Sequence, residues 1–241
     1  TYKELKGLRV KYVPTDTTSP STAAAGDIWY NSATFELKGY VGRAAWASNP
    51  PTGDTLFRRG SAGTSTASFI AGGDAGPAPS VTNKTEEWSG YGFGAGGNIN
   101  TARYSLAAAG TQTAGLIFGG DVSPGNYKDE CESYDGSSWT EVGDLNTARF
   151  VTMGVGTSTA ALCFGGLKSP SNALSNNSEE WDGSSWTAGN AMNTARESTG
   201  QAGIQTAALA YGGYGGSPAA TLTTTESYDG TNWTAGTSIN T

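Results

Sequence analysis

The chain has 241 residues, 15% of them charged, and a formal net charge of −7. This acidic balance argues against a nucleic-acid-binding function, because such proteins neutralise phosphates with clustered lysine and arginine. No apolar stretch approaches the roughly 18 residues that a membrane-spanning helix needs. The sequence contains no histidine, which excludes Ser-His-Asp and Cys-His nucleophile systems and imidazole metal sites.

The first 46 residues do not carry the repeat that fills the rest of the chain. Residues 8–13 alternate in polarity and predict a strand, and residues 14–25 form a Thr/Ser/Pro/Ala linker. Residues 1–25 are therefore a candidate attachment segment. Residues 26–31 and 36–40 predict a strand pair within a hairpin module at residues 26–46. Trp46 stands in phase with the tryptophans of the repeat, so this module is also a candidate part of a closing repeat unit.

From residue 47 onward the chain repeats itself. The string Asn-Thr-Ala-Arg occurs at residues 100–103, 146–149 and 193–196, and the chain ends on Asn240 and Thr241 in the same phase. A Gly-Gly pair follows a short apolar run at residues 72–73, 119–120, 165–166 and 212–213. A Glu-x-aromatic motif follows each pair, and a second aromatic lies five residues further on, at Phe93, Trp139, Trp186 and Trp233.

Each repeat predicts four short strands. The first starts near the arginine, the second ends at Gly-Gly, the third carries Glu-x-aromatic and the fourth carries the second aromatic. Asp-Gly at residues 135–136, 182–183 and 229–230 predicts a type I′ hairpin turn between the last two strands. A four-stranded unit of about 47 residues is typical of a β-propeller blade. The expected fold is all-β, with units at residues 47–93, 94–139, 140–186 and 187–233 and a tail at 234–241.

The length favours five blades, since 241 divided by about 47 is roughly five. Six or seven blades follow if the chain belongs to a longer protein. Gly-Gly, an aromatic, a tryptophan and an opening arginine together resemble the kelch repeat over residues 47–241. The hairpin module and the Asn-Thr-Ala-Arg form of the repeat resemble tail-fibre and other virion proteins of bacteriophages. This resemblance implies a propeller fold and a virion location.

Arginine and glutamate recur once per unit, which favours structural ion pairs over a ligand site. The arginines are Arg103, Arg149 and Arg196, with Leu56 in the first unit, and the glutamates are Glu86, Glu132, Glu179 and Glu226. The alternative is that the three arginines form a ring of positive charge around one mouth of the central propeller channel, where they would bind an anion. A ligand site is expected to break the repeat symmetry, so we expect Arg–Glu bridges.

No residue set predicts catalysis or metal binding. Residues 133–139 resemble the Asp box of sialidase propellers, but with Asp and Gly adjacent a hairpin turn is the better interpretation. Adjacent carboxylates such as Glu86 and Glu87 point to opposite faces of a strand, which argues against a glycosidase pair. Cys131 and Cys163 are expected as buried thiols, with a disulfide left open, and no cofactor is expected.

The four repeats differ most in the stretches between Gly-Gly and Glu-x-aromatic, at residues 74–85, 121–131, 167–178 and 214–225. These stretches are expected on the same face as the Asn-Thr-Ala-Arg turns, and loops that differ on a repeated scaffold are where binding usually lies. The alternative is that these loops differ through neutral sequence drift and do not bind a partner. The candidate binding residues are Asn126, Tyr127, Lys128, Asn172, Asn176 and Tyr214.

These observations favour a non-enzymatic bacteriophage virion protein: a tail-fibre, receptor-binding or capsid-decorating component. Its expected partners are other virion proteins, further copies of itself, and a host-surface glycan or protein. One alternative is a kelch interaction module of a bacterial surface protein, located at the cell surface. Another is a glycan-cleaving propeller enzyme.

Overall fold

The computed structural model describes residues 10–13, 28–31, 36–39, 52–53, 55–76, 80–216 and 221–239. Within these ranges the secondary structure consists of strands, bridges and turns, with no helix and hence none long and apolar enough to cross a membrane. The predicted all-β class is confirmed. The chain divides into two compact units, Thr1–Ser48 and Asn49–Thr241.

The first unit contains one three-stranded sheet. Its strands are β1 (Val10–Val13), β2 (Ile28–Asn31) and β3 (Glu36–Gly39). β2 and β3 pair antiparallel, as predicted, while β1 pairs with β2 in parallel. The linker at residues 14–25 and Trp46 lie outside the described residues.

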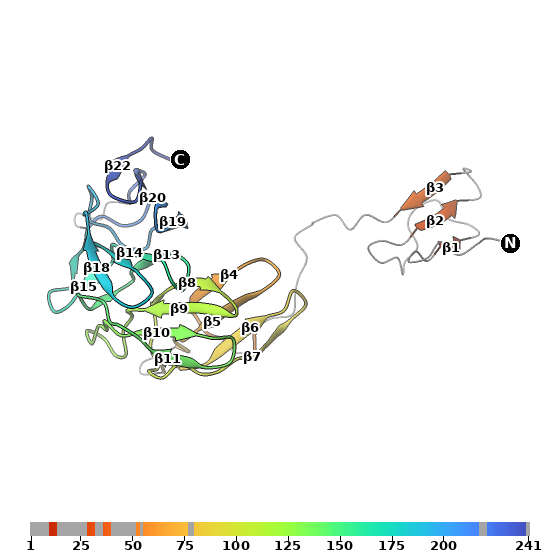
Figure 1. The fold of residues 1–241 in the computed structure, drawn as a ribbon, viewed down its shortest axis with the longest axis horizontal. Helices are drawn as coiled ribbons and strands as arrows, with labels where there is room; N and C mark the ends of the chain where they lie inside the picture. The colour runs from red at the N-terminus through yellow and green to blue at the C-terminus, as the bar shows by residue number, and fades with distance from the viewer. Residues whose placement is uncertain are drawn as a thin grey trace. The chain divides into compact units, whose positions relative to one another are not determined.

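The second unit contains four antiparallel sheets of four strands each, in step with the sequence repeat (Figure 1). Sheet I comprises β4 (Gly60–Gly63), β5 (Ser68–Ala71), β6 (Thr85–Trp88) and β7 (Phe93–Ala95). Sheet II comprises β8 (Ala107–Thr111), β9 (Ala114–Phe118), β10 (Cys131–Tyr134) and β11 (Trp139–Glu141). Sheet III comprises β13 (Met153–Gly156), β14 (Ala161–Phe164), β17 (Ser178–Trp181) and β18 (Trp186–Gly189). Sheet IV comprises β19 (Gly200–Ile204), β20 (Ala207–Tyr211), β21 (Thr225–Tyr228) and β22 (Trp233–Ala235).

Consecutive sheets pack face to face. The first strands lie next to one another in chain order, with β4 against β8, β8 against β13, and β13 against β19. Three buried clusters fill the spaces between consecutive sheets. At each interface a tryptophan of the later sheet meets an aromatic ring of the earlier one: Trp139 meets Phe69, Trp186 meets Phe118, and Trp233 meets Phe164. The repeated rings thus form the core that joins the sheets.

The first strand of each sheet begins four residues later than the recurring arginine, which corrects the predicted start. In sheet II, Tyr104 follows Arg103 and bridges to Asp121, and Ser105 then adopts φ +52° before β8 begins at Ala107. Arg58, Val151 and Ser198 are left-handed at the equivalent positions. A left-handed residue breaks the extended run, because φ in a strand lies near −120 to −140°. The arginine is therefore held in the connection between sheets.

The predicted hairpins between the third and fourth strands are present, but their turns are not type I′. Tyr134 pairs with Trp139, which leaves a four-residue loop, and within that loop only Gly136 has positive φ. The Asp135 carboxylate accepts hydrogen bonds from the backbone N–H groups of Ser137 and Ser138, both at 2.8 Å. Asp182 does the same in sheet III. The aspartate thus acts through its side chain, and its own backbone needs no left-handed conformation.

Candidate functional site

The recurring arginines are buried and paired with the recurring glutamates. Arg103 lies 2.8 Å from Glu132, Arg196 lies 2.7 Å from Glu226, and Arg149 forms the same pair with Glu179. All three arginines are 0% exposed, so they cannot present charge to a ligand. The second oxygen of each glutamate accepts the backbone N–H of the repeat asparagine: Asn100, Asn146 or Asn193. Each pair thus ties the connection between sheets to the third strand.

Sheet I also has this ion pair, which sequence analysis did not predict. Leu56 stands at the arginine position, yet Arg59 pairs with Glu86 and donates from Nε to the Gly72 carbonyl at 3.0 Å. Arg149 and Arg196 donate to the equivalent carbonyls of Gly165 and Gly212, but from Nη1. A guanidinium group can reach one place from two backbone positions because its side chain is long, so the pairing survives the loss of the motif.

The candidate binding residues lie in the variable loops of sheets II, III and IV. Asn126 is exposed, but Tyr127 stacks on Phe150 with ring centroids 5.0 Å apart, and Lys128 pairs with Glu130 at 3.0 Å. Asn176 donates from Nδ2 to the Met192 carbonyl. Asn172 is exposed and left-handed, on the turn of a small sheet formed by β12 (Arg149–Phe150), β15 (Leu167–Lys168) and β16 (Ala173–Leu174). Tyr214, 36% exposed, is bridged through its backbone to Glu197 and Thr221.

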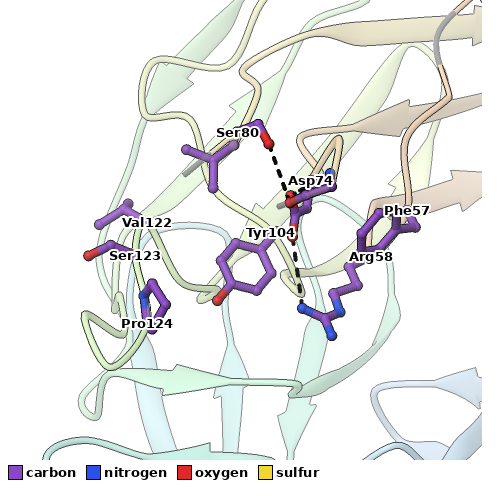
Figure 2. Close-up of a pocket in the computed structure, with 10 residues that line it drawn as sticks. Phe57, Arg58, Asp74, Ser80, Tyr104, Val122, Ser123 and Pro124 are labelled. Atoms are coloured by element: carbon purple, nitrogen blue, oxygen red, sulfur yellow. Dashed lines mark hydrogen bonds and ion pairs between the residues drawn. The ribbon is translucent and has the colours of Figure 1, made fainter. Parts of the chain in front are cut away.

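A pocket of about 310 Å³ lies where the variable loops of sheets I and II meet (Figure 2). The described residues that line it come from both sheets: Phe57, Arg58, Asp74, Gly76, Ser80, Val81, Tyr104, Val122, Ser123 and Pro124. The variable stretch of each sheet lies beside the residue that follows the arginine position, since Phe57 bridges to Asp74 and Tyr104 to Asp121. The variable loops of sheets I, II and IV thus begin beside the connections that carry the arginine position.

The pocket breaks the repeat symmetry in two ways. Val81 bridges to Asp74 as Tyr127 bridges to Asp121, so these two residues are equivalent. Tyr127 stacks on Phe150, whereas the smaller Val81 leaves the equivalent space open beside Tyr104. Arg58, in addition, occupies the left-handed position that holds Ser105, Val151 and Ser198 in the other sheets.

Arg58 supplies the exposed charge of the pocket. Its guanidinium carbon lies 5.5 Å from the Phe57 ring centroid and 5.6 Å from that of Tyr104, within range of cation–π contact. Its ion pair with Asp74 is long, 3.9 Å, and 54% of its side chain is exposed. Figure 2 shows the guanidinium extending between the two rings. Arg58 can therefore donate hydrogen bonds to a ligand that lies over the rings.

The carboxylates around the pocket are engaged by the protein. Asp121 accepts the Tyr104 hydroxyl at 3.0 Å and the backbone N–H groups of Ser123, Gly125 and Asn126. Burial and this hydrogen bond raise the pKa of Tyr104 to about 12, so its hydroxyl stays protonated. Asp74 accepts from the Gly76 N–H and faces Arg58. These groups shape the loops and hold Tyr104 in place.

The cysteines are buried free thiols, as expected. Burial raises the pKa of Cys131 to about 12 and that of Cys163 to about 11, so neither thiolate forms near neutral pH. Among the described residues, no group of three or more acidic or cysteine side chains is placed to hold a metal ion.

No protein-family model matches the chain, and no curated protein matches it. Arg58, Phe57 and Tyr104 were not predicted as site residues from the sequence, although one sequence feature pointed to Arg58. Arg58 and Arg59 are adjacent in the one unit whose opening arginine is replaced.

Proposed function

We propose that the four sheets are blades of a kelch-like β-propeller, and that this propeller is a non-enzymatic binding scaffold in a bacteriophage particle. Two features support a scaffold. The recurring arginines and glutamates are buried in mutual ion pairs, and the loops that differ between sheets begin beside the connections between sheets. Repeated residues hold the sheets together, and unrepeated ones remain for a partner.

The observation that carries the binding proposal is the open space beside Tyr104. One sheet further on, Tyr127 fills the same place with a planar ring stacked 12° from the plane of Phe150. A ligand group with a flat or apolar face can occupy the pocket as Tyr127 occupies its neighbour. Arg58 would donate to an oxygen on the edge of that group. A sugar ring of a host-surface glycan has this chemistry, with a C–H face and peripheral oxygens.

Binding to arrayed host-surface polysaccharides, with the same glycans titrated in solution, tests this proposal. Val81→Tyr places in sheet I the ring that sheet II carries, so we expect it to abolish binding. Arg58→Ala is expected to weaken binding at least tenfold. Thr221→Tyr is the matched control, because Thr221 holds the equivalent bridge position in sheet IV. Unchanged binding by Val81→Tyr, or equal loss in the control, would refute the pocket as the site.

The virion location needs a separate test, since the pocket does not depend on it. Antibodies against the purified chain should label tails or capsids of intact phage particles in electron micrographs. Labelling of bacterial cell surfaces in cultures free of phage would instead support the surface-module alternative.

A further inference from the structure

The four sheets are of two kinds that alternate along the chain. The third strand reads Glu-Glu-Trp in sheets I and III, at residues 86–88 and 179–181, and Glu-Ser-Tyr in sheets II and IV, at residues 132–134 and 226–228. The turn between the first two strands alternates with it. It carries a serine in sheets I and III, Ser65 and Ser158, and a glutamine in sheets II and IV, Gln112 and Gln205.

We call sheets I and III tryptophan sheets and sheets II and IV tyrosine sheets, after the aromatic residue of the third strand. The order of the two kinds determines which side chains form hydrogen bonds between neighbouring sheets. Where a tyrosine sheet follows a tryptophan sheet, the tyrosine hydroxyl donates to the second glutamate of the earlier sheet: Tyr134 to Glu87 at 2.5 Å, and Tyr228 to Glu180. The glutamine of the later sheet donates to the tryptophan carbonyl, at 3.1 Å for Gln112 to Trp88 and 2.7 Å for Gln205 to Trp181.

The opposite order uses other contacts. Sheet III follows sheet II, and Ser133 replaces the glutamate because Trp181 has no hydroxyl to donate. The Trp181 indole N–H is satisfied within its own sheet by the Ser158 carbonyl at 2.9 Å. Trp88 makes the equivalent bond to Ser65 at 3.0 Å. The side of a tyrosine sheet that faces the next sheet therefore fits a tryptophan sheet.

Sheet IV is a tyrosine sheet whose next-sheet side is uncovered. Leu209 is 40% exposed, Tyr211 37% and Ile239 43%. Their equivalents in sheets I to III are all fully or almost fully buried: Phe69, Leu116 and Leu162; Ala71, Phe118 and Phe164; Ile99, Leu145 and Met192. In the other sheets these three positions pack against the next sheet, and no next sheet covers them among the described residues.

The complementary surface lies on sheet I. At the I–II interface the Phe69 ring packs beside Gly115, Tyr134 and Trp139. The equivalents of those three residues in sheet I are Ser68, Trp88 and Phe93. Together with Thr64 and Ser65 they line a hollow of about 230 Å³. At the I–II interface the equivalents of these lining residues surround Phe69. Leu209 is the residue of sheet IV that is equivalent to Phe69, so the hollow has the lining that would receive Leu209.

We infer that in the 241-residue chain sheet IV of one copy docks on sheet I of a second copy, with Leu209 entering the hollow beside Trp88. Sheet I is a tryptophan sheet with Ser65 in its first turn, and this is the kind of sheet that fits after sheet IV. The contact is head-to-tail, so it closes a ring or extends into a filament. The alternation favours an even number of sheets in a closed ring, in place of the five expected from length.

Directed disulfide formation tests this pairing. Leu209→Cys and Ser68→Cys are introduced into separate chains, which are mixed under mild oxidation. We expect a covalent dimer from the mixture and none from either variant alone. The native cysteines are buried and are not expected to form cross-links. Leu209→Asp in the otherwise unchanged chain should lower the mass in sedimentation equilibrium to that of a monomer, and Thr231→Asp, in an exposed turn of the same sheet, should not.

Each other outcome contradicts the inference. A dimer of Leu209→Cys with itself would show a symmetric contact. A cross-link within one chain carrying both substitutions would show that sheet IV closes on sheet I of the same copy. A monomeric unchanged chain without cross-links would show that this side of sheet IV takes no second copy. None of these results bears on glycan binding at the pocket between sheets I and II.

Discussion

Arg59 forms a buried ion pair with Glu86, although it stands three residues later in its repeat than Arg149 does in the pair with Glu179. The charge pair is therefore retained in all four sheets while the arginine position changes. A buried glutamate without its arginine would remain an uncompensated charge, which costs several kcal/mol. This cost explains why sheet I recovers the guanidinium from another position.

Removing one partner of such a pair should destabilise the fold strongly. We expect Arg149→Met to lower the free energy of unfolding by about 3–5 kcal/mol, because Glu179 is left charged and buried. Arg58→Met is the control, since its side chain is half exposed and its ion pair is long. Urea titrations of both variants give the comparison. Equal losses would contradict the ion-pair argument.

Cys131 leaves a tryptophan without the hydroxyl acceptor that the other interfaces provide. The Trp139 indole N–H donates to the Thr85 hydroxyl at 3.0 Å, and Trp233 donates to the Ser178 hydroxyl at 2.8 Å. Trp186 faces the equivalent position, Cys131, whose thiol is only a weak acceptor, and its buried N–H makes no hydrogen bond of ordinary geometry to the described part of the chain. Cys131→Ser should therefore stabilise the protein by about 1 kcal/mol.

Thermal or urea unfolding measures this gain. Cys163→Ser is the control, because the Cys163 thiol already lies 3.1 Å from the Thr152 hydroxyl. The serine would therefore give no new acceptor to an indole N–H. A loss of stability in Cys131→Ser would refute the acceptor argument.

The aspartates in the hairpin turns make stability depend on acid pH. Backbone N–H donors, Ser138 for Asp135 and Ser185 for Asp182, lower the pKa of both carboxyls from 3.8 to about 2. A lowered folded-state pKa stabilises the fold above the unfolded-state value, and this stabilisation is lost as pH falls toward 2. We expect Asp135→Asn/Asp182→Asn to lower the melting temperature at pH 7, with the difference narrowing between pH 4 and pH 2.

The comparison uses wild type and variant melted in parallel across that pH range. Asp129→Asn/Glu141→Gln, which removes the same two negative charges outside these turns, serves as the control. A difference in melting temperature that stays constant with pH would show that the carboxylate charge does not contribute.

Val151 holds a left-handed conformation, φ +52°, that disfavours a β-branched residue. Left-handed backbone costs about 1–2 kcal/mol per residue for most side chains, and asparagine tolerates it best after glycine. Val151→Asn is therefore expected to raise the free energy of unfolding by about 1 kcal/mol. Ser105→Asn, at the equivalent position of sheet II, should have a smaller effect because serine is not β-branched. Chemical unfolding of both variants checks the order.

The repeat made the fold predictable. Four phased copies of Gly-Gly, Glu-x-aromatic and a second aromatic indicated four-stranded sheets, and the equal recurrence of arginine and glutamate indicated their pairing. Two details of backbone geometry were not predictable. The late start of each first strand depends on a non-glycine residue with positive φ, and the hairpin turns depend on aspartate side chains that accept backbone N–H groups.

Sequence alone therefore determined the sheets, the strands within them and the residues that join them, because these depend on local patterns that recur. The pocket, the substitute pair of Arg59 with Glu86 and the uncovered side of sheet IV were decided by tertiary structure. Each depends on side chains from distant positions meeting in space. Val81 became informative only when its place beside Tyr104 could be compared with the stacking of Tyr127 on Phe150, a relationship that no spacing in the chain encodes.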